Sequence, residues 1–371
     1  MANSNLTNAK KAKNDEFYTQ YGDIQKEIEA YLEFNPNIFR GKVVYCNCDD
    51  PFESNFFRYF VLNFNKLGLK QLITTSYKPS PVANTQLGLF GNDKTLTELK
   101  GRPKINANKF IINEVHDIDG DGEFNLKDVA MQLKTNKHNE WTPLEGDGDF
   151  RSDECINLLK QSDIVVTNPP FSLFREYVKQ LFDYNKKFVI IGNMNAITYK
   201  EVFPLIKANS LWLGATGNGS DMVFAVPNGM DIAESDRQKA ARLGYVGDYT
   251  RLGNSCWFTN IDHGRRHKPL PLMTMEDNLK YSRHKEIKGK KSYNKYDDYN
   301  AIEVSFTDSI PLDYDGVMGV PISFLDKYNP NQFEIIGIDR YVKDNPNYGK
   351  RFTIGGQEIY ARVLIKHKNV K

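Results

Sequence analysis

The tetrapeptide Asn168-Pro169-Pro170-Phe171 combines residue types that could bind a planar amine. Its two prolines fix the backbone and remove two N–H donors. The side-chain oxygen of Asn168 and the carbonyl of Pro169 therefore remain as hydrogen-bond acceptors, and Phe171 offers an aromatic face beside them. A substrate –NH2 group could donate to these acceptors while its ring stacks on Phe171. We expect a planar substrate such as a nucleobase; the alternative is a proline-rich turn that holds a core phenylalanine.

The segments around the tetrapeptide alternate between strand and helix. Apolar runs predict strands at 42–49, 71–77, 163–167 and 187–194. Helical spacing or flanking turns predict helices at 53–67, 173–184 and 197–209, and a first helix in the segment 15–34 with Asp23 as its N-cap. This alternation implies a parallel sheet covered by helices. The tetrapeptide directly follows the strand at 163–167, and ligands bind at the carboxyl ends of strands in open α/β sheets.

Two regions depart from this alternation. Residues 78–143 interrupt it and are expected to form an insertion, with a short strand at 109–115. Residues 210–215 and 222–227 are two strand candidates separated by a glycine-rich turn, which predicts an antiparallel hairpin at the sheet edge. The periodicity weakens after residue 231, so the C-terminal part is expected to be a separate, mixed region.

Longer blocks resemble those of the EcoRI-type adenine-specific DNA methyltransferases. These blocks lie at 15–19, 46–56, 146–152, 166–174, 192–201 and 313–330, and the resemblance covers about residues 13–364. The resemblance implies an α/β, Rossmann-like methyltransferase fold, in which the sheet is mostly parallel and carries the antiparallel hairpin at its edge. It also implies a catalytic domain at 13–230 with the insertion, and a C-terminal DNA-recognition region at 231–371.

The activity implied by the resemblance is transfer of a methyl group from S-adenosylmethionine to N6 of an adenine at a specific site in duplex DNA. Such a base must leave the stack to reach the enzyme. Asn168 and Pro169 would accept from the N6 amine, Pro170 would shape the loop, and Phe171 would stack on the ring. Asn-Pro-Pro loops also serve other amino nitrogens, so an RNA or protein-amide methyltransferase remains an alternative, as does a catalytically silent nucleic-acid-binding subunit.

Cofactor residues are assigned by the same resemblance. Phe17, Tyr18 and Thr19 resemble the motif that lies over the methionine part of the cofactor. Residues 46–51 take the place of the first strand and its loop, but C-D-D-P stands where the family usually has glycines. Cys46, Asp49 and Asp50 are the candidates there, and Asp49 and Asp50 could accept from amino or hydroxyl groups. The alternative for Asp50 is a helix N-cap.

A second cofactor segment is Asp149-Phe150 in the block G-D-G-D-F-R-S. The resemblance predicts that Asp149 accepts from the adenine amine of the cofactor and that Phe150 packs on its ring; the alternative is a Gly-Asp turn. The second strand ends in Thr74-Thr75-Ser76 and holds no acid there, so the contact to the cofactor ribose is unassigned.

Charge is nearly balanced over the chain but not along it. The 371 residues carry a formal net charge of +2, which is no global signature of nucleic-acid binding. Residues 263–295 nevertheless hold 10 Lys+Arg against 3 Asp+Glu, interleaved with tyrosines. This segment predicts DNA contacts from Arg265, Arg266, Lys268, Lys290 and Lys291, with a solvated charged loop as the alternative.

Residues 117–128 fit much of the spacing of a calcium-binding loop. Asp117, Asp119, Asp121 and Asp128 stand at ligand positions. Because the last of them is not the usual bidentate Glu, we expect at most a weak calcium site in this loop. The sequence predicts no metal ion in catalysis. The alternative is an acidic glycine turn held by Asx hydrogen bonds.

Composition excludes several other protein classes. Hydrophobic residues make up 40% and charged residues 26%, as in globular proteins and unlike disordered or collagenous chains. Four scattered cysteines predict neither a disulfide framework nor a zinc site. The polar N-terminus lacks the apolar stretch of a signal peptide, which favours a cytoplasmic location. A cognate restriction endonuclease is a candidate partner; the recognition sequence and the oligomeric state are open.

Overall fold

The computed structural model describes residues 18–48, 54–77, 107–122, 124–135, 138–216, 222–226, 232–342 and 349–368. Phe17, Asp49 and Asp50 lie outside these ranges. The chain divides into two compact units: Met1–Met194 with Thr216–Ile261, and Asn195–Ala215 with Asp262–Lys371. The first unit thus extends past the expected boundary at residue 230, because the strand Ser255–Thr259 pairs with a strand of the first unit.

The main sheet of the first unit has a parallel centre and antiparallel flanks. Its order is β5 (Glu140–Pro143), β4 (Asn108–Ile112), β3 (Gln71–Thr75), β2 (Val43–Cys46), β6 (Ile164–Thr167), β7 (Lys187–Asn193) and β11 (Ser255–Thr259). Strands β3, β2, β6 and β7 are parallel, whereas β4, β5 and β11 run antiparallel to their neighbours. The expected insertion therefore contributes β4 and β5 to the sheet itself.

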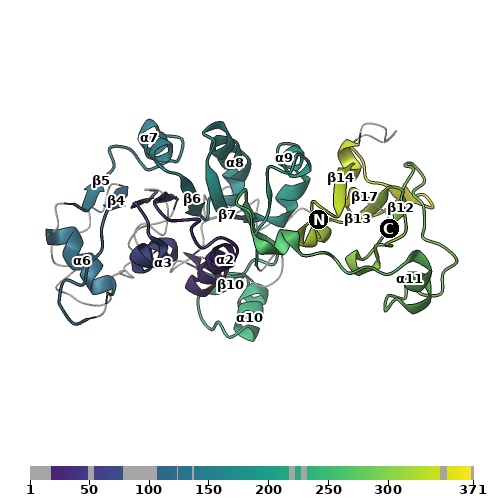
Figure 1. Ribbon diagram of the computed structural model, residues 1–371, viewed down its shortest axis with the longest axis horizontal. Coiled ribbons are helices and arrows are strands. Elements are labelled where there is room, and N and C mark those ends of the chain that lie inside the picture. The colour runs from purple at the N-terminus through teal and green to yellow at the C-terminus, as the bar shows by residue number, and fades with distance from the viewer. Residues whose placement is uncertain are drawn as a thin grey trace. The chain divides into compact units, whose positions relative to one another are not determined.

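Helices cover both faces of this sheet, and the central strands are accordingly apolar on both sides. α2 (Tyr21–Phe34) and α3 (Asn55–Leu62) lie on one face, and α7 (Asp153–Gln161) and α8 (Phe174–Asp183) on the other (Figure 1). Val44 and Cys46 of β2 join the aromatic core under α2 and α3, which includes Phe56, Phe57 and Phe60. α4 (Phe64–Leu67) and α6 (Leu126–Thr135) complete the helices around β3 and β4.

A small antiparallel sheet holds the N-terminal motif of the first unit. It consists of β1 (Tyr18–Thr19), β9 (Val223–Ala225) and β10 (Tyr249–Arg251), with α10 (Glu234–Arg242) next to β10. The expected hairpin between residues 210–215 and 222–227 is wrong, because β9 pairs with β1 on one edge and with β10 on the other. These two pairings occupy both edges of β9, which leaves no edge for a strand formed by residues 210–215, although these residues are close to β9 in the sequence.

The second unit is built on a four-stranded sheet. Its order is β12 (Ile302–Glu303), β13 (Met318–Pro321), β17 (Arg362–His367) and β14 (Phe333–Ile338), with a hairpin of β15 (Thr353–Ile354) and β16 (Gln357–Glu358). β8 (Trp212–Leu213), α9 (Phe203–Lys207) and α11 (Met275–Tyr281) also belong to this unit. In the described part of the chain, no helix is long and apolar enough to span a membrane.

Candidate functional site

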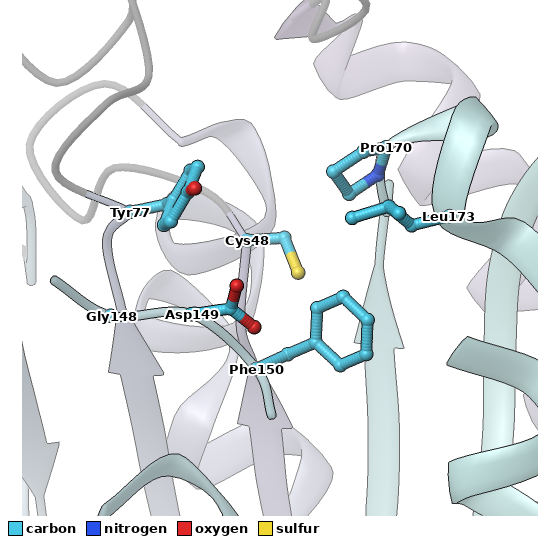
Figure 2. A pocket seen from close by; sticks show the side chains of 7 residues that line it. All are labelled: Cys48, Tyr77, Gly148, Asp149, Phe150, Pro170 and Leu173. Carbon is cyan, nitrogen blue, oxygen red and sulfur yellow. The ribbon is translucent and has the colours of Figure 1, made fainter. Parts of the chain in front are cut away.

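A pocket of about 240 Å³ lies at the carboxyl edge of the parallel strands of the first unit. Its lining comes from Cys48 after β2, Tyr77 after β3, the segment 148–150 before α7, and Pro170 and Leu173 after β6. Figure 2 shows Cys48, Asp149 and Phe150 between Tyr77 on one side and Pro170 with Leu173 on the other. Four segments meet here, and three of them follow parallel strands that end at the same edge of the sheet.

The loop after β2 takes a glycine-like conformation without a glycine. Cys48 has a φ of 66°, in the left-handed region that side chains rarely adopt. The neighbouring Asn47 is buried; its side-chain oxygen accepts from the Tyr177 hydroxyl, and its carbonyl accepts from the Thr167 hydroxyl. These two bonds tie the loop to α8 and β6, so the chain can turn closely at Cys48 although the family's glycines are missing.

The N-terminal motif is anchored beside the same loop. The Asn55 side chain, in the first turn of α3, donates to the carbonyl of Thr19 at 2.7 Å. The hydroxyl of Thr19 is buried and has no hydrogen-bond partner among the residues that the structure describes. Ser54 caps α3 by accepting from the amides of Phe56 and Phe57, at 3.1 and 3.2 Å, so the cap considered for Asp50 is already supplied.

Gly148 permits the close approach that forms one wall of the pocket. Its φ is +79°, and a Cβ built on it would lie 1.9 Å from the carbonyl oxygen of Ser76 and 2.9 Å from the Cβ of Ala107. No side chain fits there. The segment 148–150 therefore passes directly over the end of β3.

Phe150 is held in place from both sides. Its ring meets the edge of the Tyr177 ring at 5.0 Å between centroids, and the Gln180 side chain donates to its carbonyl at 3.0 Å. Burial raises the pKa of Tyr177 well above its usual value, so its hydroxyl stays protonated and donates to Asn47. Phe150 thus presents a fixed aromatic face to the pocket.

Asp149 is oriented by Arg151, which we had not singled out from the sequence. The Arg151 side chain donates to both carboxylate oxygens of Asp149, at 2.9 and 2.6 Å, and also to Glu176 at 3.0 Å. The hydrogen bonds with Asp149 raise the pKa of the Arg151 guanidinium. A bidentate pair of this kind sets the direction of a carboxylate as well as its charge.

The tetrapeptide 168–171 lies between this pocket and the core. Asn168 is 5% exposed, directly after β6, and Pro169 and Pro170 are also buried. Phe171 is half-buried at the start of a short 3-10 helix, where it packs against the core cluster. Of the four residues, Pro170 lines the pocket. Phe171 thus packs against the core and is still partly accessible to solvent.

Of the predicted cofactor residues, the structure brings Asp149 and Phe150 to the pocket with Pro170. Cys46 is fully buried at the end of β2, and neither Tyr18 nor Thr19 is among the lining residues. Sequence reasoning missed Cys48, Tyr77 and Gly148. The position of Tyr77 just after the strand at 71–75, where cofactor-binding side chains are expected, is the sequence signal that indicates it.

The predicted DNA-binding residues have different surroundings within the second unit. Arg265 pairs with the Asp326 carboxylate and donates to the Ala215 carbonyl at 3.0 Å. Arg266 is 7% exposed, and its guanidinium lies 3.6 Å from the centre of the Trp212 ring. Both arginines therefore stabilise their own unit. In contrast, Lys268, Lys290 and Lys291 are exposed.

The acidic loop uses its carboxylates to hold its own backbone. Asp117 accepts from the amides of Gly120 and Gly122, at 2.7 and 2.8 Å. Buried Asp128 accepts from the amides of Ile118 and Asn125, at 2.8 and 2.9 Å. Asp119 pairs with a lysine, Asp121 is exposed, and ligand atoms of Asp117, Asp119 and Asp128 lie within 4.8 Å of one another. These bonds are those of the acidic glycine turn.

Comparison with known proteins places the chain in one family. The family model described as "Adenine-specific methyltransferase EcoRI" matches residues 5–368. The type II methyltransferase M.EcoRI of Escherichia coli is 44% identical over 370 residues, which cover 100% of this chain and 98% of that protein. The type II methyltransferase M.MpnI of Mycoplasma pneumoniae is 34% identical over 381 residues, covering 97% of each chain. No solved structure matches. The chain therefore belongs to the EcoRI family of adenine-specific methyltransferases.

Proposed function

We propose that this protein is a site-specific DNA methyltransferase that transfers a methyl group from S-adenosylmethionine to N6 of an adenine flipped out of duplex DNA. The observation that carries the proposal is the pocket that joins Asp149 and Phe150 to Pro170 of the tetrapeptide. A cofactor held at the first two residues would have its methyl group close to the loop that binds the target amine. The central α/β sheet with a parallel centre supports a Rossmann-like methyltransferase fold.

The pocket fits one end of the cofactor. Its lining offers aromatic rings and one carboxylate, which suit a heterocycle that carries an amino group. Phe150 would pack on the adenine ring of the cofactor, and Asp149 would accept from its amine. Tyr77 is the candidate for the ribose side, and the buried hydroxyl of Thr19 for the methionine part. When bound, S-adenosylmethionine would supply a methyl group that its sulfonium already activates.

The tetrapeptide would bind the target adenine. Asn168 and the Pro169 carbonyl would accept hydrogen bonds from the N6 amine, which keeps the nitrogen lone pair directed at the methyl group. Phe171 would stack on the target ring. Catalysis would then come mainly from alignment, because a well-oriented pair of reactants avoids most of the entropic cost of meeting. No residue of the chain needs to form a covalent bond with the base.

Duplex DNA would be held by the exposed lysines of the second unit. Lys268, Lys290 and Lys291 are accessible. Lys268 and Lys291 suit phosphate contacts, which supply affinity without reading sequence, and Lys290 suits a further contact to the DNA. Arg265 and Arg266 would support that surface from within. The first unit would thus act as the catalytic part and the second as the recognition part. The relatives' names as type II methyltransferases support a restriction endonuclease as a partner in the same system.

The test is methyl transfer from tritiated S-adenosylmethionine to duplex DNA, RNA and protein, followed by sequencing of the modified DNA. We expect label in DNA as N6-methyladenine in one sequence context. Asn168→Ala should abolish transfer while cofactor binding stays within a few-fold, whereas Asn157→Ala, on the exposed surface of α7, should be neutral. Label found only in RNA or protein, or near-normal turnover by Asn168→Ala, would contradict the proposal.

A further inference from the structure

A second pocket, of about 250 Å³, lies within the second unit, between Leu279 of α11 and the residues that follow this helix. Tyr293 and Glu303 contribute buried side chains to its lining, and Glu286, Lys290, Ser292 and Asn294 contribute exposed ones. The pocket lies in the segment where positive charge is concentrated. Six further lysines of that segment are exposed: Lys268, Lys280, Lys285, Lys288, Lys291 and Lys295.

The buried side of this pocket is rigid and its polar groups are satisfied. The Glu303 carboxylate accepts from Arg362 at 2.7 Å, from the Tyr296 hydroxyl at 2.5 Å and from the Ser305 hydroxyl at 2.9 Å. The Tyr293 hydroxyl donates to a backbone carbonyl at 2.7 Å. A buried, fully bonded network of this kind holds its shape without a ligand.

The exposed side chains of the pocket are available to a ligand. Within the described residues, the side chains of Glu286, Lys290, Ser292 and Asn294 form no hydrogen bond or ion pair. Exposed Ser292 and Asn294 flank buried Tyr293, and all three residues line the pocket.

We infer that this pocket reads the edge of a base in the target DNA; the inference rests on the proposed DNA substrate. An Asn side chain can bond an adenine edge through both of its polar atoms, a Lys can donate to guanine, and a Glu can accept from cytosine. The lining of the pocket contains all three residue types. The exposed lysines beside it would hold the phosphates on either side.

A phosphate fits this pocket less well than a base does. The exposed carboxylate of Glu286 belongs to the lining and would repel a phosphate group, whereas the charge of Glu303 is already paired with Arg362. Lys291 is exposed next to the pocket but is not part of its lining, so it suits a phosphate contact. Neighbouring residues of one segment would thus have separate tasks, Lys290, Ser292 and Asn294 for sequence and Lys291 for affinity.

The experiment compares Asn294→Ala and Ser292→Ala with Lys291→Ala as the matched control. Each purified full-length protein methylates a library of random duplex sequences, and sequencing gives the preference at every position of the site. We expect Asn294→Ala to lose roughly 5- to 150-fold of the discrimination at one base pair and to keep it elsewhere. Lys291→Ala should weaken binding to all sequences about equally and lower the slope of log affinity against log salt by about one.

Unchanged preferences in both pocket variants would overturn the inference, and so would a loss that is equal at all sequences. Thermal unfolding of each variant shows whether a general loss comes from misfolding, and Ser292→Ala provides a second, smaller change in the same pocket. A failure of the proposed function looks different: the unaltered protein would then methylate no adenine in any duplex.

Discussion

Gly148→Ala should separate cofactor binding from folding. The added methyl group would lie 1.9 Å from the Ser76 carbonyl oxygen, where real Cβ atoms keep at least 3.0 Å. Ser76 cannot yield, because its amide donates to the Asn108 carbonyl at 2.9 Å and its hydroxyl accepts from the Asn108 amide at 2.8 Å. The segment 148–150 must therefore move by more than 1 Å, and it carries Asp149 and Phe150.

The size of the effect follows from this displacement. A misplacement of about 1 Å at a binding or catalytic group can cost about 100-fold, which corresponds to about 2.7 kcal/mol. The left-handed backbone at position 148 adds about 1–2 kcal/mol for any residue with a Cβ. We therefore expect the Kd for S-adenosylmethionine to rise by about 100-fold.

Calorimetric titration with S-adenosylmethionine measures this Kd, and thermal unfolding of the same sample verifies that the variant is folded. Gly146→Ala is the matched control, because no atom lies within 4 Å of its added Cβ and its φ is outside the left-handed region. Its Kd should stay within twofold, an energy of about 0.4 kcal/mol. Normal affinity in a folded Gly148→Ala protein, or an equal loss in Gly146→Ala, would refute the reasoning.

Three further predictions concern charged side chains. Arg151→Met should weaken cofactor binding by about fivefold, since the half-exposed pair with Asp149 is worth about 1 kcal/mol; calorimetry showing no change would contradict it. Burial raises the pKa of Asp339 from 3.8 to about 6 and lowers that of His263 from 6.5 to about 4. The Asp339 contribution to stability is lost as pH rises from about 4 to 6, and that of His263 as pH falls from 6.5 towards 4, so they oppose each other. Asp339→Asn should therefore lose up to about 3 kcal/mol on acidification from pH 7 to 4.5 in urea unfolding, more than the unaltered protein. Asp128→Ala should lower the free energy of unfolding by about 2 kcal/mol with or without Ca²⁺, because the part-buried amides of Ile118 and Asn125 lose their acceptor; a loss that appears only with Ca²⁺ would instead favour ion binding.

The helices and strands that carry the site could be predicted locally. The strand before Asn168 was expected at 163–167 and is observed at Ile164–Thr167, and the helix after it was expected at 173–184 and is observed at Phe174–Asp183. Apolar runs and turn residues determine such elements because they act over a few neighbouring positions. The partner of β9 could not be found in this way, since its pairing with β1 depends on a contact some 200 residues away along the chain.

The solvent exposure of Arg265 and Arg266 could not be predicted from the sequence either. Arg265 and Arg266 lie in the same basic segment as Lys290, and their charge alone does not distinguish them. Asp326 and Trp212 reach the two arginines only through folding and give each of them a partner within its own unit; the DNA contacts of Arg265 and Arg266 stay a prediction. A run of charged residues in the sequence shows only that the charges are present. The solvent exposure of each charged side chain depends on what the rest of the chain packs against it.

The sequence by itself determined which chemistry this protein can do. The order of acceptors and aromatic face in residues 168–171, and the strand before them, follow from local residue types and indicate an amine-binding loop. Only the tertiary structure decided what stands beside that loop. Cys48 in a left-handed turn, Gly148 against Ser76, and Asp149 held by Arg151 meet at Pro170 because separate strands end at one edge of the sheet. Such meetings depend on long-range packing, which no short stretch of sequence contains.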